Sequence, residues 1–171
     1  PEAELVLRIR PDDTGARCRL GQKFGASLDR VPSLLARAKE KGLPVVGVSY
    51  HIGSGQTDLN KFLEAVDLSR KAFDLAASHG HPNMRLLNIG GGFPTHTQPR
   101  GGELGFSQIA RALRPKLDRE FPAGGGVRII AEPGRFMAGS CQTLALSVIG
   151  RRVVPRGAGE AGGRGVCEDH V

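Results

Sequence analysis

Residues 85–94, RLLNIGGGFP, decide the fold together with two segments of the same design, VVGVSYHIGSG at residues 45–55 and VRIIAEPGR at residues 127–135. Each segment is an apolar run that leads directly into a glycine-bearing loop. Each run predicts a strand, and each loop predicts a place for a ligand. Parallel strands put such loops along one C-terminal edge of their sheet, where barrel and open α/β folds build their sites. The three loops are therefore expected to meet.

The rest of the chain alternates strands with helices. Strands are expected over residues 4–9, 45–50, 86–89 and 127–131, with helices between them over residues 27–42, 57–80 and 106–120. Ser27 and either Thr57 or Asp58 are candidate N-caps, while Gly42 and Gly80 follow the last helical turns. This order predicts an α/β fold with a parallel sheet and right-handed crossovers.

The length indicates part of a larger protein. With 171 residues the chain can bury a core, yet it is shorter than the roughly 250 residues of a complete (β/α)8 barrel. Its first residues, PEAELVLRIR, enter a strand almost at once and without an initiator methionine. We therefore expect an internal fragment. The sequence contains no recognisable signal peptide and no apolar run long enough to span a membrane, which favours a cytoplasmic protein without membrane association.

The cysteines and the charge distribution argue against several classes of protein. Cys18, Cys141 and Cys167 are odd in number and widely spaced, with no CxxC pair. This argues against a disulfide framework or a metal site, and we expect reduced thiols, with Cys141 in the core. The net charge of +7 comes from basic residues interleaved with acidic ones, and one tyrosine and no tryptophan are present to stack on bases. Nucleic-acid binding is therefore disfavoured.

The alternation of strand and helix ends near residue 139. Residues 142–149 predict a fifth strand with no helix between it and the fourth, so a β-rich domain is expected to begin near Ser140. The following segment is charged, rich in glycine and without apolar periodicity. We therefore divide the chain into an α/β part at 1–139, the start of a β-domain at 140–150, and a disordered tail at 151–171.

The loop residues predict a phosphate-binding cup. Glycines 90–92 offer backbone N–H groups that can surround an anion, and the Ser54 hydroxyl and the Arg135 guanidinium are matching donors. The motifs of a Walker loop and of a dinucleotide-binding fingerprint are absent. A triple glycine is also common in plain flexible turns, so that alternative stays open. The long loop at 90–105 is further expected to be mobile or lid-like.

Glu132 is expected to face a cation, because a carboxylate beside a phosphate cup would otherwise repel the anion. A protonated pyridine nitrogen meets this requirement, since a carboxylate there keeps the nitrogen charged and strengthens the ring as an electron sink. His51, at the end of its strand, could stack on such a ring. Alternatively, backbone groups of the sheet could satisfy its imidazole.

The motifs GVSYHIGSGQTD at 47–58, LLNIGGGFP at 86–94 and VRIIAEPGRF at 127–136 closely resemble the ornithine decarboxylase group of pyridoxal-phosphate enzymes. The resemblance begins at LVLRIRPDD, residues 5–13, and extends to about Ile149. It implies the C-terminal half of a pyridoxal-phosphate-binding (β/α)8 TIM barrel of the alanine racemase type. That half-barrel would run into the first strand of a C-terminal β-domain.

The resemblance also implies residue roles. His51 would support catalysis by stacking on the pyridoxal ring, Glu132 would pair with the pyridine nitrogen, and Arg8 would lie close to the cofactor. The other cofactor-binding residues would hold the phosphate or frame its loops; they are Ser54, Gly91, Gly92, Pro133, Gly134 and Arg135. The family's Schiff-base lysine and catalytic cysteine have no counterpart here, because the six lysines lie in a loop or on expected helices. No catalytic residue proper and no metal ligand is assigned.

The function implied is the pyridoxal-phosphate-dependent decarboxylation of L-ornithine to putrescine, a step of polyamine biosynthesis, in a full-length homodimer. The fragment alone is expected to be inactive. Alternatives are the decarboxylation of diaminopimelate, lysine or arginine, an inactive regulatory homologue of the antizyme-inhibitor kind with antizyme as partner, and a cofactor-binding carrier on the same barrel. The intact HIGSG, GGGFP and EPGR motifs argue against the inactive homologue. The strand expected after Ser140 argues against the single-domain carrier.

Overall fold

The computed structural model describes residues 3–99, 101, 103–141, 143, 145–147, 149–152 and 168–170. The chain divides into two compact units, residues 1–141 and residues 142–171, and each is considered by itself. The first unit contains all the residues predicted to bind a ligand.

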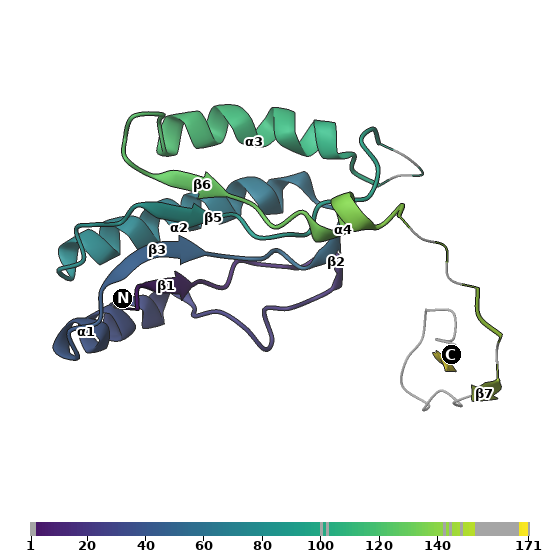
Figure 1. The fold of residues 1–171 in the computed structure, drawn as a ribbon, viewed down its shortest axis with the longest axis horizontal. Helices are drawn as coiled ribbons and strands as arrows, with labels where there is room; N and C mark the ends of the chain where they lie inside the picture. Colours follow the sequence, from purple (N-terminus) through teal and green to yellow (C-terminus); the bar gives the residue numbers. More distant parts are fainter. Residues whose placement is uncertain are drawn as a thin grey trace. The chain divides into compact units, whose positions relative to one another are not determined.

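A parallel sheet of four strands organises the first unit. The strands run in the order β1 (Leu5–Arg8), β3 (Val45–Ser49), β5 (Leu86–Asn88) and β6 (Arg128–Ile130), and every neighbouring pair is parallel. Figure 1 shows the four arrows pointing the same way. The register places Arg8, Ser49, Asn88 and Ile130 in one row across the C-terminal edge. The predicted parallel sheet is confirmed.

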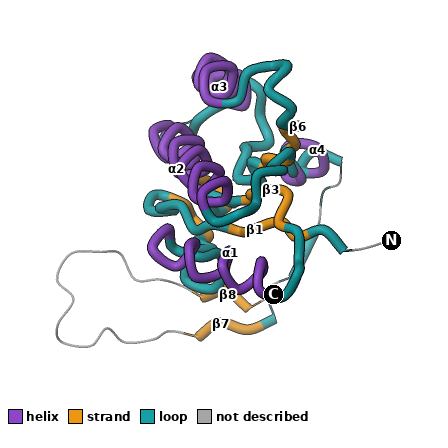
Figure 2. The backbone as a smooth tube through the Cα atoms, turned by 90° about the vertical axis from the view of Figure 1, so that its left-hand side faces the viewer, coloured by secondary structure: helices purple, strands orange, loops and turns teal. Residues whose placement is uncertain are grey.

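Three helices connect these strands: α1 (Val31–Glu40), α2 (Leu59–Ser78) and α3 (Phe106–Glu120). Figure 2 shows them together on one side of the strands, as successive crossovers of one hand require. They close an apolar core against the sheet. Its largest fully buried apolar side chains are Ile9, Val31, Leu35, Val48, Ile52, Phe62, Val66, Leu87 and Ile109.

Three of the four helix caps predicted from the sequence are confirmed. The Asp58 carboxylate accepts the N–H of Asn60, which caps α2. Gly42 and Gly80, with φ of +68° and +82°, end α1 and α2 in the left-handed region as predicted. The prediction for Ser27 is wrong in detail. Ser27 precedes the 3-10 turn η1 (Leu28–Arg30), makes no capping side-chain bond there, and α1 begins only at Val31.

Three short elements are not evident from the sequence. Strands β2 (Ala16–Cys18) and β4 (Ser54–Gln56) form an antiparallel pair, and α4 (Gly134–Ala138) follows β6. The residues of β2 and β4 read as polar loop because each strand is only three residues long and contains no apolar alternation. In Figure 1, β2 and α4 lie beyond the tips of the strand arrows. All three elements therefore stand at the C-terminal edge of the sheet.

The predictions for the C-terminal region are corrected in two places. The described positions within 142–149 are not in a strand; β7 follows at Gly150–Arg152 and pairs antiparallel with β8 (Glu168–His170). A strand exists only where a neighbour accepts its backbone hydrogen bonds, and apolar residues alone do not supply that neighbour. Disorder was predicted at 151–152 and 168–170, where the structure assigns strand. The rest of the predicted tail, at 153–167 and 171, lies outside the described residues.

The prediction that Cys141 is a core thiol is wrong. Its side chain is exposed and its Sγ lies 3.4 Å from the Met137 carbonyl oxygen, just beyond α4. Cys141 is the last residue of the first unit, so few side chains are available to pack around it. Cys18 is exposed as well, and Cys167 lies outside the described residues. Within those residues, no helix is long and apolar enough to cross a membrane.

Core packing gives a direct test of this fold. Leu35 on α1 is fully buried, whereas its neighbour Leu34 is 43% exposed. Leu35→Ala should lower the free energy of unfolding by about 2–5 kcal/mol, because lost burial and an unfilled cavity add. Leu34→Ala should change it by only about 0.5 kcal/mol. Urea unfolding of both variants measures the difference, and equal losses would contradict the orientation of α1.

Candidate functional site

Three of the predicted phosphate-binding residues line one cavity of about 210 Å³. Ser54 belongs to β4, Gly92 follows β5, and Arg135 lies in the first turn of α4 after β6. These residues are far apart in the sequence but share the C-terminal edge of the sheet. A water molecule occupies about 30 Å³ in the liquid, so the cavity has room for a phosphate group.

The pairing of β2 with β4 holds the Ser54 wall of the cavity. Cys18 pairs with Ser54 in that ladder. Gln56, only 4% exposed, supports it from inside: its side-chain amide donates to the carbonyls of Thr14 and Ile52, at 3.2 and 3.4 Å. Its Oε1 also accepts two backbone N–H groups, at 2.9 Å each. This buried amide is therefore fully bonded, as burial requires.

Gly92 shows why a glycine is needed in the loop after β5. Its φ is +102°, and a Cβ there would lie 2.6 Å from the Gly53 carbonyl oxygen. Any side chain would push apart the loops that follow β3 and β5. The close approach leaves Gly92 on the cavity wall.

His51 lies just after β3, and its two ring nitrogens have different surroundings. Its Nδ1 accepts the N–H of Gly53 at 3.0 Å, so one nitrogen is satisfied by backbone, as the alternative interpretation expected. Its Nε2 faces Gly91, where a Cβ would lie 2.8 Å away. The missing side chain at Gly91 therefore leaves the outer side of the imidazole free of neighbouring side-chain atoms there.

Burial and nearby charges favour the neutral form of His51. Burial lowers the pKa of its imidazole below the ordinary value of 6.5, and the positive charge of Arg8 lowers it further. The Glu132 carboxylate acts in the opposite direction. Burial and Arg8 outweigh Glu132, so the neutral imidazole is favoured at neutral pH. In that form Nδ1, which accepts the Gly53 N–H, carries no proton.

Glu132 lies in the loop between β6 and α4 and is exposed. Its Oε1 accepts the side-chain amide of Asn88 at 2.6 Å, and its backbone N–H donates to the Gly90 carbonyl at 2.8 Å. Among the described residues the Glu132 carboxylate forms no ion pair with a cationic side chain. Its negative charge is therefore available to a cation from outside the protein.

The remaining predicted residues frame these groups. Arg8 ends β1 and is exposed, with its guanidinium carbon 5.6 Å from the centre of the Phe24 ring. Pro133 is the N-cap residue of α4. Gly134 opens that helix, and its N–H donates to the Glu132 carbonyl at 2.7 Å. None of these three residues lines the cavity of Ser54 and Arg135.

Other residues at this edge were not predicted. Arg17 and Glu103 both line the cavity and form an ion pair, which ties β2 to the loop that precedes α3. That loop is also closed by backbone bonds from Phe106 and Ser107 to the carbonyls of His96 and Thr97. Its predicted mobility stays a prediction. No sequence motif marks these contacts, because they join residues up to 86 positions apart.

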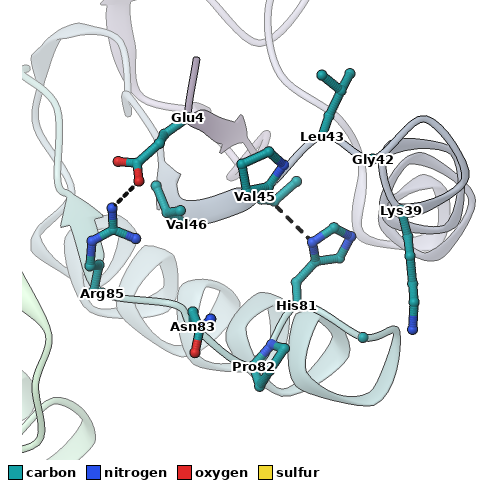
Figure 3. Close-up of a pocket in the computed structure, with 12 residues that line it drawn as sticks. Glu4, Lys39, Gly42, Leu43, Val45, Val46, His81, Pro82, Asn83 and Arg85 are labelled. Carbon is teal, nitrogen blue, oxygen red and sulfur yellow. Dashed lines mark hydrogen bonds and ion pairs between the residues drawn. The ribbon is translucent and has the colours of Figure 1, made fainter. Parts of the chain in front are cut away.

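A larger cavity, of about 310 Å³, lies at the opposite edge of the sheet, where the strands begin (Figure 3). Three of its polar side chains are already paired within the protein. Glu4 and Arg85 form an ion pair, and the buried His81 accepts from the Val45 N–H and contacts the Leu35 carbonyl at 2.9 Å. We therefore place the candidate site at the other edge, where the predicted residues gather.

The sequence matches the family described as "Pyridoxal-dependent decarboxylase, pyridoxal binding domain" over residues 1–139. Ornithine decarboxylase of Mus musculus is 49% identical over 154 residues, which are 90% of this chain and 32% of that protein. Antizyme inhibitor 2 of Xenopus laevis is 42% identical over 154 residues, 90% of this chain and 33% of that protein. The crystal structure of the Paramecium bursaria Chlorella virus arginine decarboxylase bound to agmatine has a TM-score of 0.75 at 39% identity, covering 88% of this chain and 39% of that one.

The parallel α/β fold, with a loop cavity at its C-terminal edge, is consistent with part of a TIM-barrel domain. The chain belongs to the family of pyridoxal-dependent decarboxylases. The matched segment is the pyridoxal-binding domain of that family, whose cofactor is pyridoxal phosphate. The chain spans about a third of the length of the curated relatives it matches.

The residues present fit this cofactor. The cavity offers a hydroxyl, a guanidinium and an open glycine backbone for a phosphate. Beside it, the His51 imidazole and the Glu132 backbone carbonyl border the space left by the missing Cβ of Gly91. All six lysines lie elsewhere: Lys23 is in a turn after β2, and the others are on or directly after helices. None of the six lysines therefore stands at a strand end beside the candidate site.

The charges around His51 predict a titration experiment. Its titration midpoint, followed by NMR of the cofactor-free protein, should lie below 6.5. Arg8→Met removes a positive charge and should raise the midpoint, while Glu132→Gln removes a negative charge and should lower it. Shifts of the same sign in both variants would contradict this arrangement of charges.

Proposed function

We propose that this chain is the cofactor-binding part of a basic amino acid decarboxylase that converts L-ornithine to putrescine for polyamine biosynthesis. The observation that carries the proposal is that Ser54, Gly92 and Arg135, from three separate segments of the chain, line one cavity. His51 and Glu132 lie against the adjoining Gly91. The identity of 49% to an ornithine decarboxylase favours ornithine among basic amino acids.

Each residue then has a specific role. Arg135 and Ser54 bind the phosphate, because a guanidinium and a hydroxyl donate to its oxygens. His51 packs against the ring with its free side and stays neutral there. Glu132 holds a proton on the pyridine nitrogen. Pyridoxal phosphate, when bound, supplies the electron sink that accepts the electron pair left as carbon dioxide departs.

The substrate-binding groups and the lysine that links the cofactor lie in other parts of the proposed protein. We further propose a homodimer in the cytoplasm, with antizyme as a partner. The dimer and its location follow the family resemblance, and the partner follows the similarity to antizyme inhibitor 2. Arginine and lysine remain alternative substrates, since the matched viral relative is an arginine decarboxylase.

A second candidate is a regulatory homologue without activity. It is favoured by the 42% identity to antizyme inhibitor 2, which spans nearly the same length as the match to the decarboxylase. A protein that had lost the cofactor would be under no physical requirement to maintain the cavity of Ser54, Gly92 and Arg135. The decarboxylase is therefore preferred.

The test uses the full-length protein from the complete reading frame. It should release carbon dioxide from ornithine and form putrescine only with pyridoxal phosphate present. The same assay with lysine, arginine and diaminopimelate ranks the substrates. Binding of antizyme without any decarboxylation would instead support the regulatory homologue. If the protein neither decarboxylates ornithine nor binds antizyme, both proposals are refuted.

Arg135 provides the sharpest test of the phosphate cavity. Arg135→Ala removes a charge-assisted contact worth about 1.5–3 kcal/mol, so cofactor affinity should fall by roughly ten- to a hundred-fold. Arg111→Ala is the control, because Arg111 is exposed on α3 and outside this cavity. Both are measured by titration of the full-length apoprotein with pyridoxal phosphate. Equal affinity for the Arg135 variant and the parent would contradict the assignment.

A further inference from the structure

Asn88 occupies the centre of the C-terminal edge of the sheet. It ends β5, between Ser49 on one neighbouring strand and Ile130 on the other. Its side chain makes two hydrogen bonds: Nδ2 donates to Glu132 Oε1 at 2.6 Å, and Oδ1 accepts the Gly90 N–H at 2.9 Å. The side chain thus bridges the loop after β5 and the loop after β6.

These two bonds fix which way the amide points. If the amide were turned over, its NH2 would face the Gly90 N–H and its oxygen would face the Glu132 carboxylate. Both contacts would then be repulsive. The backbone closes the same ring, because the Glu132 N–H donates to the Gly90 carbonyl at 2.8 Å.

The loops have little freedom to compensate for a lost bond. Gly90 has φ of +60°, and a Cβ there would lie 1.9 Å from the Tyr50 carbonyl oxygen. The loop after β5 is therefore packed directly on the end of the β3 segment. The Glu132 carboxylate is exposed, and without a partner it would rotate among several conformations.

An amide is a suitable partner for this purpose. It donates a hydrogen bond to the carboxylate but carries no charge, so it orients Glu132 without neutralising it. A lysine or arginine at the same place would hold the carboxylate and also cancel its charge. The second carboxylate oxygen and the full negative charge remain available to a cationic group.

We infer that Asn88 is a positioning residue, which holds the Glu132 carboxylate toward the pyridine nitrogen and ties it to Gly90 in the loop after β5. This inference rests on the proposed function for its ligand. Asn88 would act through Glu132 and Gly90, without contacting the cofactor itself.

The test is a double-mutant cycle on cofactor affinity in the full-length apoprotein. Asn88→Ala should weaken binding of pyridoxal phosphate about ten-fold, because the charged bond that holds Glu132 is lost. In a Glu132→Gln background the same change should cost about three-fold or less, because the two residues act as one unit. Asn83→Ala is the matched control, since Asn83 precedes the same strand but lines the cavity at the opposite edge (Figure 3).

Hydrogen exchange supplies a readout that does not depend on the cofactor. In the apoprotein, Asn88→Ala should speed exchange of the Gly90 amide about ten-fold or more, since its acceptor is gone, while Asn83→Ala should leave it unchanged. Unchanged affinity and unchanged Gly90 exchange in the Asn88 variant would overturn the inference. Losses that add fully in the double variant would overturn the role of Glu132.

If Asn88→Ala does not fold, the inference can still be tested in a protein that keeps Asn88. Glu132→Gln alters only an exposed side chain, and it should shift the NMR resonances of the Asn88 side-chain amide while those of Asn83 stay in place. No shift at Asn88 would overturn the inference. A parent protein that shows this coupling but binds no pyridoxal phosphate would refute the proposed function alone, so the two failures are distinguishable.

Discussion

The hydrogen-bond ladder of four parallel strands is the constraint on which the rest of the structure depends. Parallel pairing gives every strand the same direction, so the loops after β1, β3, β5 and β6 all leave at one edge. The row of Arg8, Ser49, Asn88 and Ile130 marks that edge. Residues separated by more than eighty positions become neighbours there. The candidate site is a consequence of this pairing.

The second level of organisation is backbone contact between loops. Gly92 approaches Gly53, and Gly90 approaches the end of the β3 segment, closer than any side chain would permit. The space at Gly91 in turn leaves one side of His51 open. Glycine is required at these positions because the neighbouring backbone leaves no room for a side chain. The triple glycine, which could be a plain flexible turn, therefore becomes a defined part of the cavity wall.

Some of the charged groups at this edge are paired within the protein and others are not. Burial lowers the pKa of His51, Arg8 lowers it further and Glu132 raises it, so the neutral imidazole is favoured. Glu132 is held by a neutral amide and keeps its charge. Arg17 and Glu103 compensate each other at the cavity wall, where Arg135 has no such partner among the described residues. A guanidinium and a carboxylate thus remain for a ligand with an anionic and a cationic end.

The sequence by itself determined the alternating strands and helices, the parallel sheet, the ends of α1 and α2 at Gly42 and Gly80, and the three loops that bear the candidate site. These depend on short-range properties: apolar period, capping residues and the conformational freedom of glycine. Only the tertiary structure decided that β2 pairs with β4, that Asn88 bridges Gly90 and Glu132, and that Cys141 is exposed. It also left the predicted strand at 142–149 unformed at its described positions. Each of these outcomes depends on which distant segment supplies a hydrogen-bond partner or a packing surface, and no local pattern encodes that choice.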